Sequence, residues 1–268
     1  MRLSALTRAC LAVLAVGVVA FLFAPLAVIV LFAFGKSNVQ TFPIHHWTTY
    51  WFGVAWNDPA VRSALWLSIK AGVAATAIAL VLGTLVAFGI HRFKFFGRDT
   101  VSLLLVLPIA LPGIVTGLAL QSAFNLSGVP FSIYTIIIGH ATFCIVVVFN
   151  NVIARLRRTS LSLIEASADL GATPLQTFRL VTMPMLSTAI VAGALLAFAL
   201  SFDEVIVTTF TAGAQNTLPL WIFGAIRLGQ QLPEVNAVVV GVILLTLIPI
   251  VVAARISSGE GLGGTGRL

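Results

Sequence analysis

Long runs of apolar residues recur along the whole chain. A transmembrane helix needs about 20 mostly apolar residues to cross roughly 30 Å of hydrocarbon. Six segments meet this requirement, at residues 9–34, 63–90, 100–122, 131–153, 187–211 and 236–254. The runs are apolar on every side, so the short alternating strands of a membrane barrel do not fit them. The pattern predicts an all-α, polytopic membrane protein with six transmembrane helices.

The composition supports a membrane protein and excludes a soluble enzyme. Hydrophobic residues make up 59% of the 268 residues and charged residues only 9%, whereas a soluble domain carries about 25% charged residues. Disordered, collagen-like and coiled-coil chains are excluded by the same composition. Cys10 and Cys144 both lie inside apolar runs, so we expect neither a disulfide framework nor a metal site.

The distribution of basic residues predicts the orientation in the membrane. The first apolar run follows Arg2 and Arg8 but is too long for the 7–15-residue core of a signal peptide, so we interpret it as a retained helix. With both termini in the cytoplasm, eleven of the fifteen basic residues fall in inner segments, which satisfies the positive-inside rule. These eleven are Arg2, Arg8, Arg92, Lys94, Arg98, Arg155, Arg157, Arg158, Arg179, Arg255 and Arg267. Because they are scattered over short segments, they do not indicate nucleic-acid binding.

The predicted spans divide the chain into three parts. Residues 1–62 hold the first helix and an outer loop, residues 63–254 a five-helix core, and residues 255–268 a cytoplasmic tail. The outer loops 35–62 and 212–235 are rich in aromatic residues. Such residues are typical of a helix lying at the membrane interface, and they equally suit a docking surface for an outside partner.

The loop 154–186 is the one long inner segment. Ser162 and Glu165 have the spacing of a capping box, which predicts a helix start. The helix should continue through Leu170, and Gly171 can end it in a left-handed conformation.

A second short helix should follow in the same loop. Thr173 as cap, Pro174 in the first turn and Gln176 three residues after the cap predict its start. It should run to about Met183, with Pro184 opening the fifth span. The two helices should expose apolar side chains, which usually require a partner: Leu163, Ile164, Leu170 and Phe178.

This loop resembles the EAA loop of ABC importer permeases. The pattern E-A-A, three residues, G, nine residues, I-x-L-P is matched by Glu165-Ala166-Ser167, Gly171 and Val181-Thr182-Met183-Pro184. Departures are Ser167 for alanine, Val181 for isoleucine and Met183 for leucine. The stretches 107–117 and 199–210 are similar to the PotC/YdcV-like spermidine/putrescine branch of that family.

The resemblance implies a type I importer permease with a MetI-like fold in the bacterial inner membrane. It implies that a short helix docks in a groove of a cytoplasmic ATPase through Glu165, Ala166, Asp169, Leu170 and Gly171. It also implies a heterodimer with a second homologous permease, two copies of the ATPase and a periplasmic binding protein. ATP and Mg would be bound by the ATPase, so this chain would have no catalytic site and no cofactor of its own.

Two carboxylates interrupt the fifth predicted span. Asp203 and Glu204 lie midway along it, where a charge costs roughly 2.5–3.5 kcal/mol on insertion scales. They either face a pathway for a cationic solute or form a structural pair, with Lys70 of the second span or with the partner permease. Gln121, near the outer end of the third span, either binds the solute or caps its helix. Gly113 stands where some polyamine permeases carry an acidic residue.

The third span contains two prolines and a close-packing motif. Pro108, Pro112, Gly113 and Gly117 should break or thin the helix and free carbonyl groups that can line a cavity. Gly113-x-x-x-Gly117 also favours close packing. His140 in the fourth span is interpreted as a packing histidine with satisfied hydrogen bonds.

We therefore predict the permease subunit of an ATP-driven, binding-protein-dependent importer for polyamines or a related small amine. Spermidine, putrescine, 4-aminobutyrate and an aminophosphonate all fit this interpretation. An ion-coupled secondary transporter is the first alternative, although it would usually show an internal repeat. An intramembrane enzyme is the second, and it would need a nucleophile–base or metal constellation within the spans.

Overall fold

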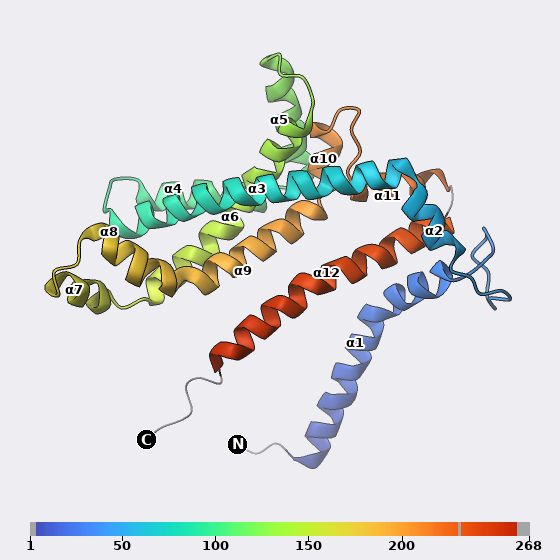
Figure 1. Ribbon diagram of the computed structural model, residues 1–268, viewed down its shortest axis with the longest axis horizontal. Coiled ribbons are helices and arrows are strands. Elements are labelled where there is room, and N and C mark those ends of the chain that lie inside the picture. The colour runs from blue at the N-terminus through green and yellow to red at the C-terminus, as the bar shows by residue number, and fades with distance from the viewer. Residues whose placement is uncertain (1–3, 230–231, 262–268) are drawn as a thin grey trace. The chain divides into compact units, whose positions relative to one another are not determined.

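The computed structural model describes residues 4–229 and 232–261 (Figure 1). Across these residues the chain is helical, with one isolated bridge between Gly35 and Trp47. The helices are α1 (Ala5–Ala33), α2 (Tyr50–Asn57), α3 (Pro59–Arg92), α4 (Arg98–Ala110), α5 (Gly113–Leu126), α6 (Ile133–Arg158), α7 (Leu161–Asp169), α8 (Pro174–Thr177), the π-helical turn η1 (Phe178–Thr182), α9 (Met183–Phe202), α10 (Ile206–Thr211), α11 (Leu218–Leu228) and α12 (Leu232–Gly261). The predicted all-α class is confirmed.

The predicted count of six spans is not confirmed. Among the described residues, four helical segments are long and apolar enough to cross a membrane, and α4 with α5 makes a fifth if a pair bent by 102° counts as one span. The four segments are Leu6–Ala33, Pro59–Arg92, Ile133–Arg158 and Pro174–Phe202. The sixth predicted span, 236–254, falls in α12, whose described apolar part is Leu232–Leu247.

The chain forms two compact units, Met1–Arg62 with Gly224–Leu268 and Ser63–Phe223. In the first unit α12 packs against both α1 and α2. The helix α2 is tied to the segment after α1 by Trp51, whose indole N–H donates to the carbonyl of Gly35 at 3.0 Å. The three-part division of the chain stays a prediction, and residues 262–268 of its predicted tail lie outside the described residues.

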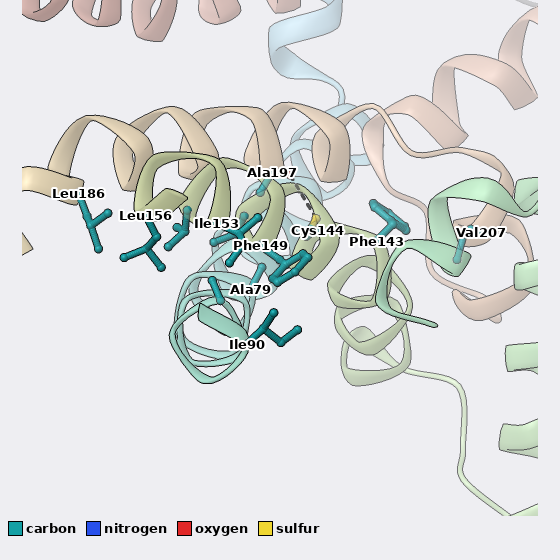
Figure 2. Close-up of a cluster of buried hydrophobic side chains, with 13 residues drawn as sticks. Ala79, Ile90, Phe143, Cys144, Phe149, Ile153, Leu156, Leu186, Ala197 and Val207 are labelled. Carbon is teal, nitrogen blue, oxygen red and sulfur yellow. Dashed lines mark hydrogen bonds between the residues drawn. The ribbon is translucent and has the colours of Figure 1, made fainter. Parts of the chain in front are cut away.

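The second unit is built around α6. This helix packs mainly against α9, and its buried face joins side chains of α3, α9 and α10 in one apolar cluster (Figure 2). The thiol of Cys144 donates to the carbonyl of Ala197 at 3.3 Å, which links α6 to α9 in the same cluster. Since lipid is as apolar as these side chains, close packing rather than exclusion from water holds such helices together.

The fifth predicted span, 187–211, is wrong at both ends. Helical structure begins at Pro174 and runs without a gap through η1 and α9, and it stops at Phe202. Met183 N–H donates to the carbonyl of Phe178 five residues earlier, so the turn before Pro184 is widened rather than broken. The π-turn therefore lets the loop 154–186 continue directly into the span, although proline has no N–H to donate.

The helix break after α9 also changes the expected setting of two carboxylates. Asp203 caps α9, and Glu204 precedes α10 instead of lying midway along a helix. The Glu204 carboxylate accepts from the N–H of Val207 at 2.9 Å. Side chains thus supply hydrogen bonds that the interrupted helix lacks, which a backbone inside a membrane requires.

Candidate functional site

The first element of interest is α7, in the predicted inner loop. Its start differs from the expected capping box of Ser162 and Glu165. The cap is Ser160, whose hydroxyl accepts from Ser162 N–H at 3.3 Å. Because Ser160 already satisfies this donor, the helix begins at Leu161 and Ser162 lies inside its first turn.

The end of α7 is a Schellman motif. Gly171 has a φ of +81°, and its N–H donates to the carbonyl of Ala168 at 2.9 Å. Ala172 N–H donates to the carbonyl of Ser167 at 3.0 Å. This pair of bonds satisfies carbonyls that a helix end leaves free, so the predicted left-handed stop at Gly171 is confirmed.

The second helix of the loop starts as predicted. Thr173 and Gln176 form a reciprocal capping box, in which Thr173 N–H donates to the Gln176 side chain at 2.8 Å. A bond not anticipated from the sequence ties the two helices together: the hydroxyls of Ser167 and Thr177 lie 2.8 Å apart. Since the Ser167 proton goes to the carbonyl of Ile164 at 2.9 Å, Thr177 is the donor of this bond.

The loop presents a continuous exposed surface. Glu165, Ala166, Asp169 and Leu170 are all exposed, and they lie on neighbouring positions of one helical face. Leu170 is 89% exposed, the most of the expected apolar residues. The other expected apolar residues are exposed Leu163 and Phe178 and half-buried Ile164.

A second element of interest is formed by two broken helices in the same unit. The predicted break is confirmed at Pro112, because α4 ends at Ala110 and α5 leaves at a sharp angle, whereas Pro108 lies inside α4 and does not break it. The short helix α10 packs along α5 (Figure 1). A Cβ atom at Gly113 would lie 3.6 Å from Ile206, and one at Gly117 would overlap the ring of Phe210. The Gly-x-x-x-Gly motif therefore acts in close packing, as expected.

This contact brings the two breaks next to each other. Gly113 directly follows the first break, and Ile206 directly follows the second. Asp203 is exposed, whereas Glu204 is half-buried and already accepts a backbone hydrogen bond. Within the described parts of the chain, no ion pair joins either carboxylate to Lys70.

Gln121 is not part of the same cluster. It is half-buried on α5, on the face that carries Gly113 and Gly117. Eight residues of helix separate it from Gly113, which is a rise of about 12 Å. The structure thus joins Asp203 and Glu204 at one break and sets Gln121 two turns further along α5.

An open hollow that was not anticipated from the sequence lies between α6 and α9. It has a volume of about 390 Å³ and is lined by Asn150, Asn151, Arg155, Arg158 and Thr188, among others. Arg155 also donates from Nε to the carbonyl of Met185 at 2.9 Å. The only signal in the sequence was a pair of asparagines near the end of a span, which by itself does not indicate a hollow.

Comparison with known proteins identifies the family. Residues 79–257 match the family model described as "Binding-protein-dependent transport system inner membrane component". The chain belongs to this family. It is 37% identical over 225 residues to the putrescine transport system permease protein PotI of Escherichia coli K12, covering 81% of this chain and 79% of PotI. It is 30% identical over 252 residues to the spermidine/putrescine transport system permease protein PotC of the same strain, covering 92% and 93%.

Solved structures agree on the fold. A bacterial ABC transporter that imports the acidic polysaccharide alginate aligns with a TM-score of 0.67 at 18% identity, over 97% of this chain and 99% of that one. The methionine ABC transporter MetNI aligns with a TM-score of 0.62 at 20% identity, over 75% and 95%. The fold is therefore that of ABC importer permeases.

Family membership decides the general activity. The chain is a membrane-embedded permease subunit of an ATP-driven, binding-protein-dependent importer. Such a subunit is not an enzyme and needs no cofactor of its own, because the ATPase is a separate subunit. A permease partner, an ATPase and a binding protein belong to importers of this general kind. These findings favour the importer over an ion-coupled transporter or an intramembrane enzyme.

Proposed function

We propose that this importer carries polyamines or a related small amine, and that the pathway in this chain includes Asp203. The observation that carries the proposal is an exposed carboxylate at a helix break beside a second helix break. An amine that is protonated at neutral pH needs anionic groups or carbonyls to replace its water shell. The names of PotI and PotC, which are similar to this chain over most of its length, point to the same ligand class.

The three candidate residues differ in how free their polar groups are to bind a ligand. Asp203 has its carboxylate free for a ligand, whereas Glu204 gives one oxygen to the N–H of Val207. Glu204 therefore serves the pathway mainly by capping α10. Gln121 would meet the ligand at a different depth, because it lies two turns along α5 from the break.

The coupling proposal concerns α7. Glu165, Ala166, Asp169, Leu170 and Gly171 would insert into a groove of the ATPase subunit. Support comes from the exposure of the first four of these residues and from the Schellman motif that fixes the end of the helix. Exposed apolar surface on a small element favours such a partner. Two ATPase copies would bind ATP and Mg, and their closure would move each coupling helix.

The assembly would be a heterodimer with a second homologous permease in the inner membrane, with both termini of this chain in the cytoplasm. Loops 35–62 and 212–235 would then face a periplasmic binding protein. Ser162→Cys, in a chain whose own thiols are removed by Cys10→Ala and Cys144→Ala, tests this orientation. A membrane-impermeant maleimide should label the introduced thiol only after the inner membrane is opened, and labelling of intact spheroplasts would contradict the orientation.

The decisive experiment is uptake by the complete importer. The chain is reconstituted with its companion permease, ATPase and binding protein, and uptake of radiolabelled spermidine, putrescine, 4-aminobutyrate and an aminophosphonate is measured. ATP-dependent uptake of an amine supports the proposal. Uptake driven by an ion gradient without the ATPase, or no uptake of any amine, would overturn it. Calorimetric titration of the binding protein with the same compounds identifies the ligand independently.

A substitution at the break tests the pathway role. Asp203→Asn removes the charge and keeps the size, so uptake of a cationic ligand should fall by about tenfold, the effect of losing one charge-assisted contact. The ATPase should still co-purify with the variant. Glu204→Gln is the matched comparison, and we expect it to affect uptake less. Unchanged uptake kinetics in Asp203→Asn would remove Asp203 from the pathway.

A further inference from the structure

A single buried histidine spans the break between α9 and α10. His140 lies on α6 and is 1% exposed. Its Nδ1 is 2.7 Å from the hydroxyl oxygen of Ser201, near the end of α9. Its Nε2 is 2.8 Å from the hydroxyl oxygen of Thr208, on α10. From the sequence we expect a packing histidine with satisfied hydrogen bonds. Its two hydrogen-bond partners lie on opposite sides of the break, one on α9 and one on α10.

The direction of each hydrogen bond follows from counting protons. The Thr208 hydroxyl has one proton, and it donates this proton to the carbonyl of Glu204 at 2.7 Å. Towards His140 this hydroxyl is therefore an acceptor, so the proton between them is on Nε2. Nδ1 of the neutral ring is then an acceptor, and the Ser201 hydroxyl donates a hydrogen bond to it. The result is one directed chain, from Ser201 through His140 and Thr208 to the backbone of Glu204.

The helix α10 depends on such contacts for its position. It has six residues, and an isolated helix of that length is unstable. A second contact from α6 reaches its far end, where the Thr135 hydroxyl shares its one proton between the carbonyl of Thr211 at 2.8 Å and that of Ser132 at 2.7 Å. The backbone that carries Asp203 and Glu204 is thus held from α6, and the two partners of His140 flank these residues in the sequence.

We propose that His140 is a positioning residue, which as the neutral Nε2–H tautomer ties α10 to α9 and thereby holds the Asp203 carboxylate in place for transport. The role in transport rests on the proposed function, since it assumes that Asp203 meets the ligand. The role in fixing the break does not, and the two are tested separately.

The break is tested by hydrogen–deuterium exchange on the full chain in lipid nanodiscs. His140→Phe removes both bonds of the ring, and Thr208→Val removes its partner on α10. Thr209→Val is the matched control, because the Thr209 hydroxyl makes the same kind of bond four residues back, to the carbonyl of Val205 at 2.8 Å, whereas the ring of His140 bonds to Ser201 and Thr208. Amides of residues 206–211 should exchange about tenfold faster in the first two variants, in proportion to a lost buried hydrogen bond. The control should stay close to the parent chain.

Two further measurements sharpen the assignment. In the double variant of His140→Phe and Thr208→Val the two effects should be less than additive, because the bond between these two residues is already lost in either single variant. His140→Gln should restore most of the protection, since its amide offers one donor and one acceptor. Nitrogen-15 NMR of the labelled histidines, with His140→Phe to assign the signal, should show the Nε2–H tautomer. Unchanged exchange in His140→Phe, or a proton on Nδ1, would overturn the proposal.

Transport measurements then test whether the histidine acts through Asp203. His140→Phe should reduce ATP-dependent amine uptake in the complete importer, with the ATPase still bound. In the Asp203→Asn background the same change should cause no further loss, whereas a general structural defect would reduce uptake in both backgrounds. A further loss in that background would overturn the transport role. If Asp203→Asn itself has no effect, the pathway proposal and the transport role of His140 fail together, and the exchange and NMR results alone decide whether His140 fixes the break.

Discussion

The Schellman motif at the end of α7 makes the inner loop sensitive to one glycine. Gly171 has a φ of +81°, and no atom lies within 4 Å of the place where its Cβ would be. The strain of a substitution there comes from the left-handed backbone conformation alone, because a larger side chain would not clash with a neighbour. A β-branched residue in the left-handed region costs roughly 1–2 kcal/mol, which lowers the population of the native cap by about 5- to 30-fold.

We expect Gly171→Val to uncouple transport while leaving the chain inserted in the membrane. Leaving the left-handed conformation would break the bonds from Gly171 N–H to Ala168 and from Ala172 N–H to Ser167. The face carrying Glu165 would then lose its fixed position relative to α8. Amine uptake and ATP hydrolysis are measured in proteoliposomes of the complete importer, and the expected result is uptake reduced by about 5- to 30-fold per ATP hydrolysed.

A second glycine provides a matched control for this strain. Gly97 has a φ of +83° and equally open surroundings, but it lies in the loop between α3 and α4. Gly97→Val should leave coupling near the parent value. Gly171→Asn should retain much of the activity, because asparagine tolerates the left-handed region. Normal uptake in Gly171→Val, or an equal loss in Gly97→Val, would refute the reasoning.

Two other contacts give predictions that do not depend on the ligand. Ser167→Ala leaves the hydroxyl of buried Thr177 without its acceptor and should destabilise the α7–α8 pair by about 1–3 kcal/mol, which is measured as faster amide exchange in α7. Adding Thr177→Val should recover part of the lost stability. Unchanged exchange in both variants would contradict the hydrogen bond between Ser167 and Thr177. Gly117→Leu should lower the free energy of unfolding of the purified chain by about 1–3 kcal/mol, because it overpacks the contact with Phe210. Gly89→Leu should have little effect, because no atom lies within 4 Å of the place where its Cβ would be. Equal melting temperatures of the two variants would argue against close packing of α5 on α10.

Local signals of the inner loop were readable from the sequence. The capping box of Thr173 and Gln176 and the left-handed stop at Gly171 both formed as expected. Each depends on residues within a few positions of one another, so the local sequence contains all the partners. The predicted start of α7 was wrong because Ser160 and Ser162 are both residues that cap helices, and local spacing does not choose between them.

The fifth span was misjudged for the opposite reason. The length of an apolar run indicates how many residues can lie within the membrane, but it does not indicate where a helix ends within that run. The break after Phe202 is stabilised by Glu204 locally and by His140 from a distant helix. The second of these partners is more than 60 residues away in the sequence, so no pattern around residue 203 predicts it.

The sequence by itself determined that this is a helical membrane protein with an EAA-type loop, because hydropathy and motif spacing depend on residue type and order alone. The tertiary structure decided where helices break, which carboxylate is exposed and which is used as a cap. It also brought the break at Pro112 next to the break at Asp203, through contacts between α5 and α10. A carboxylate in a membrane acquires its role from the groups around it, and those groups come from helices that only folding brings together.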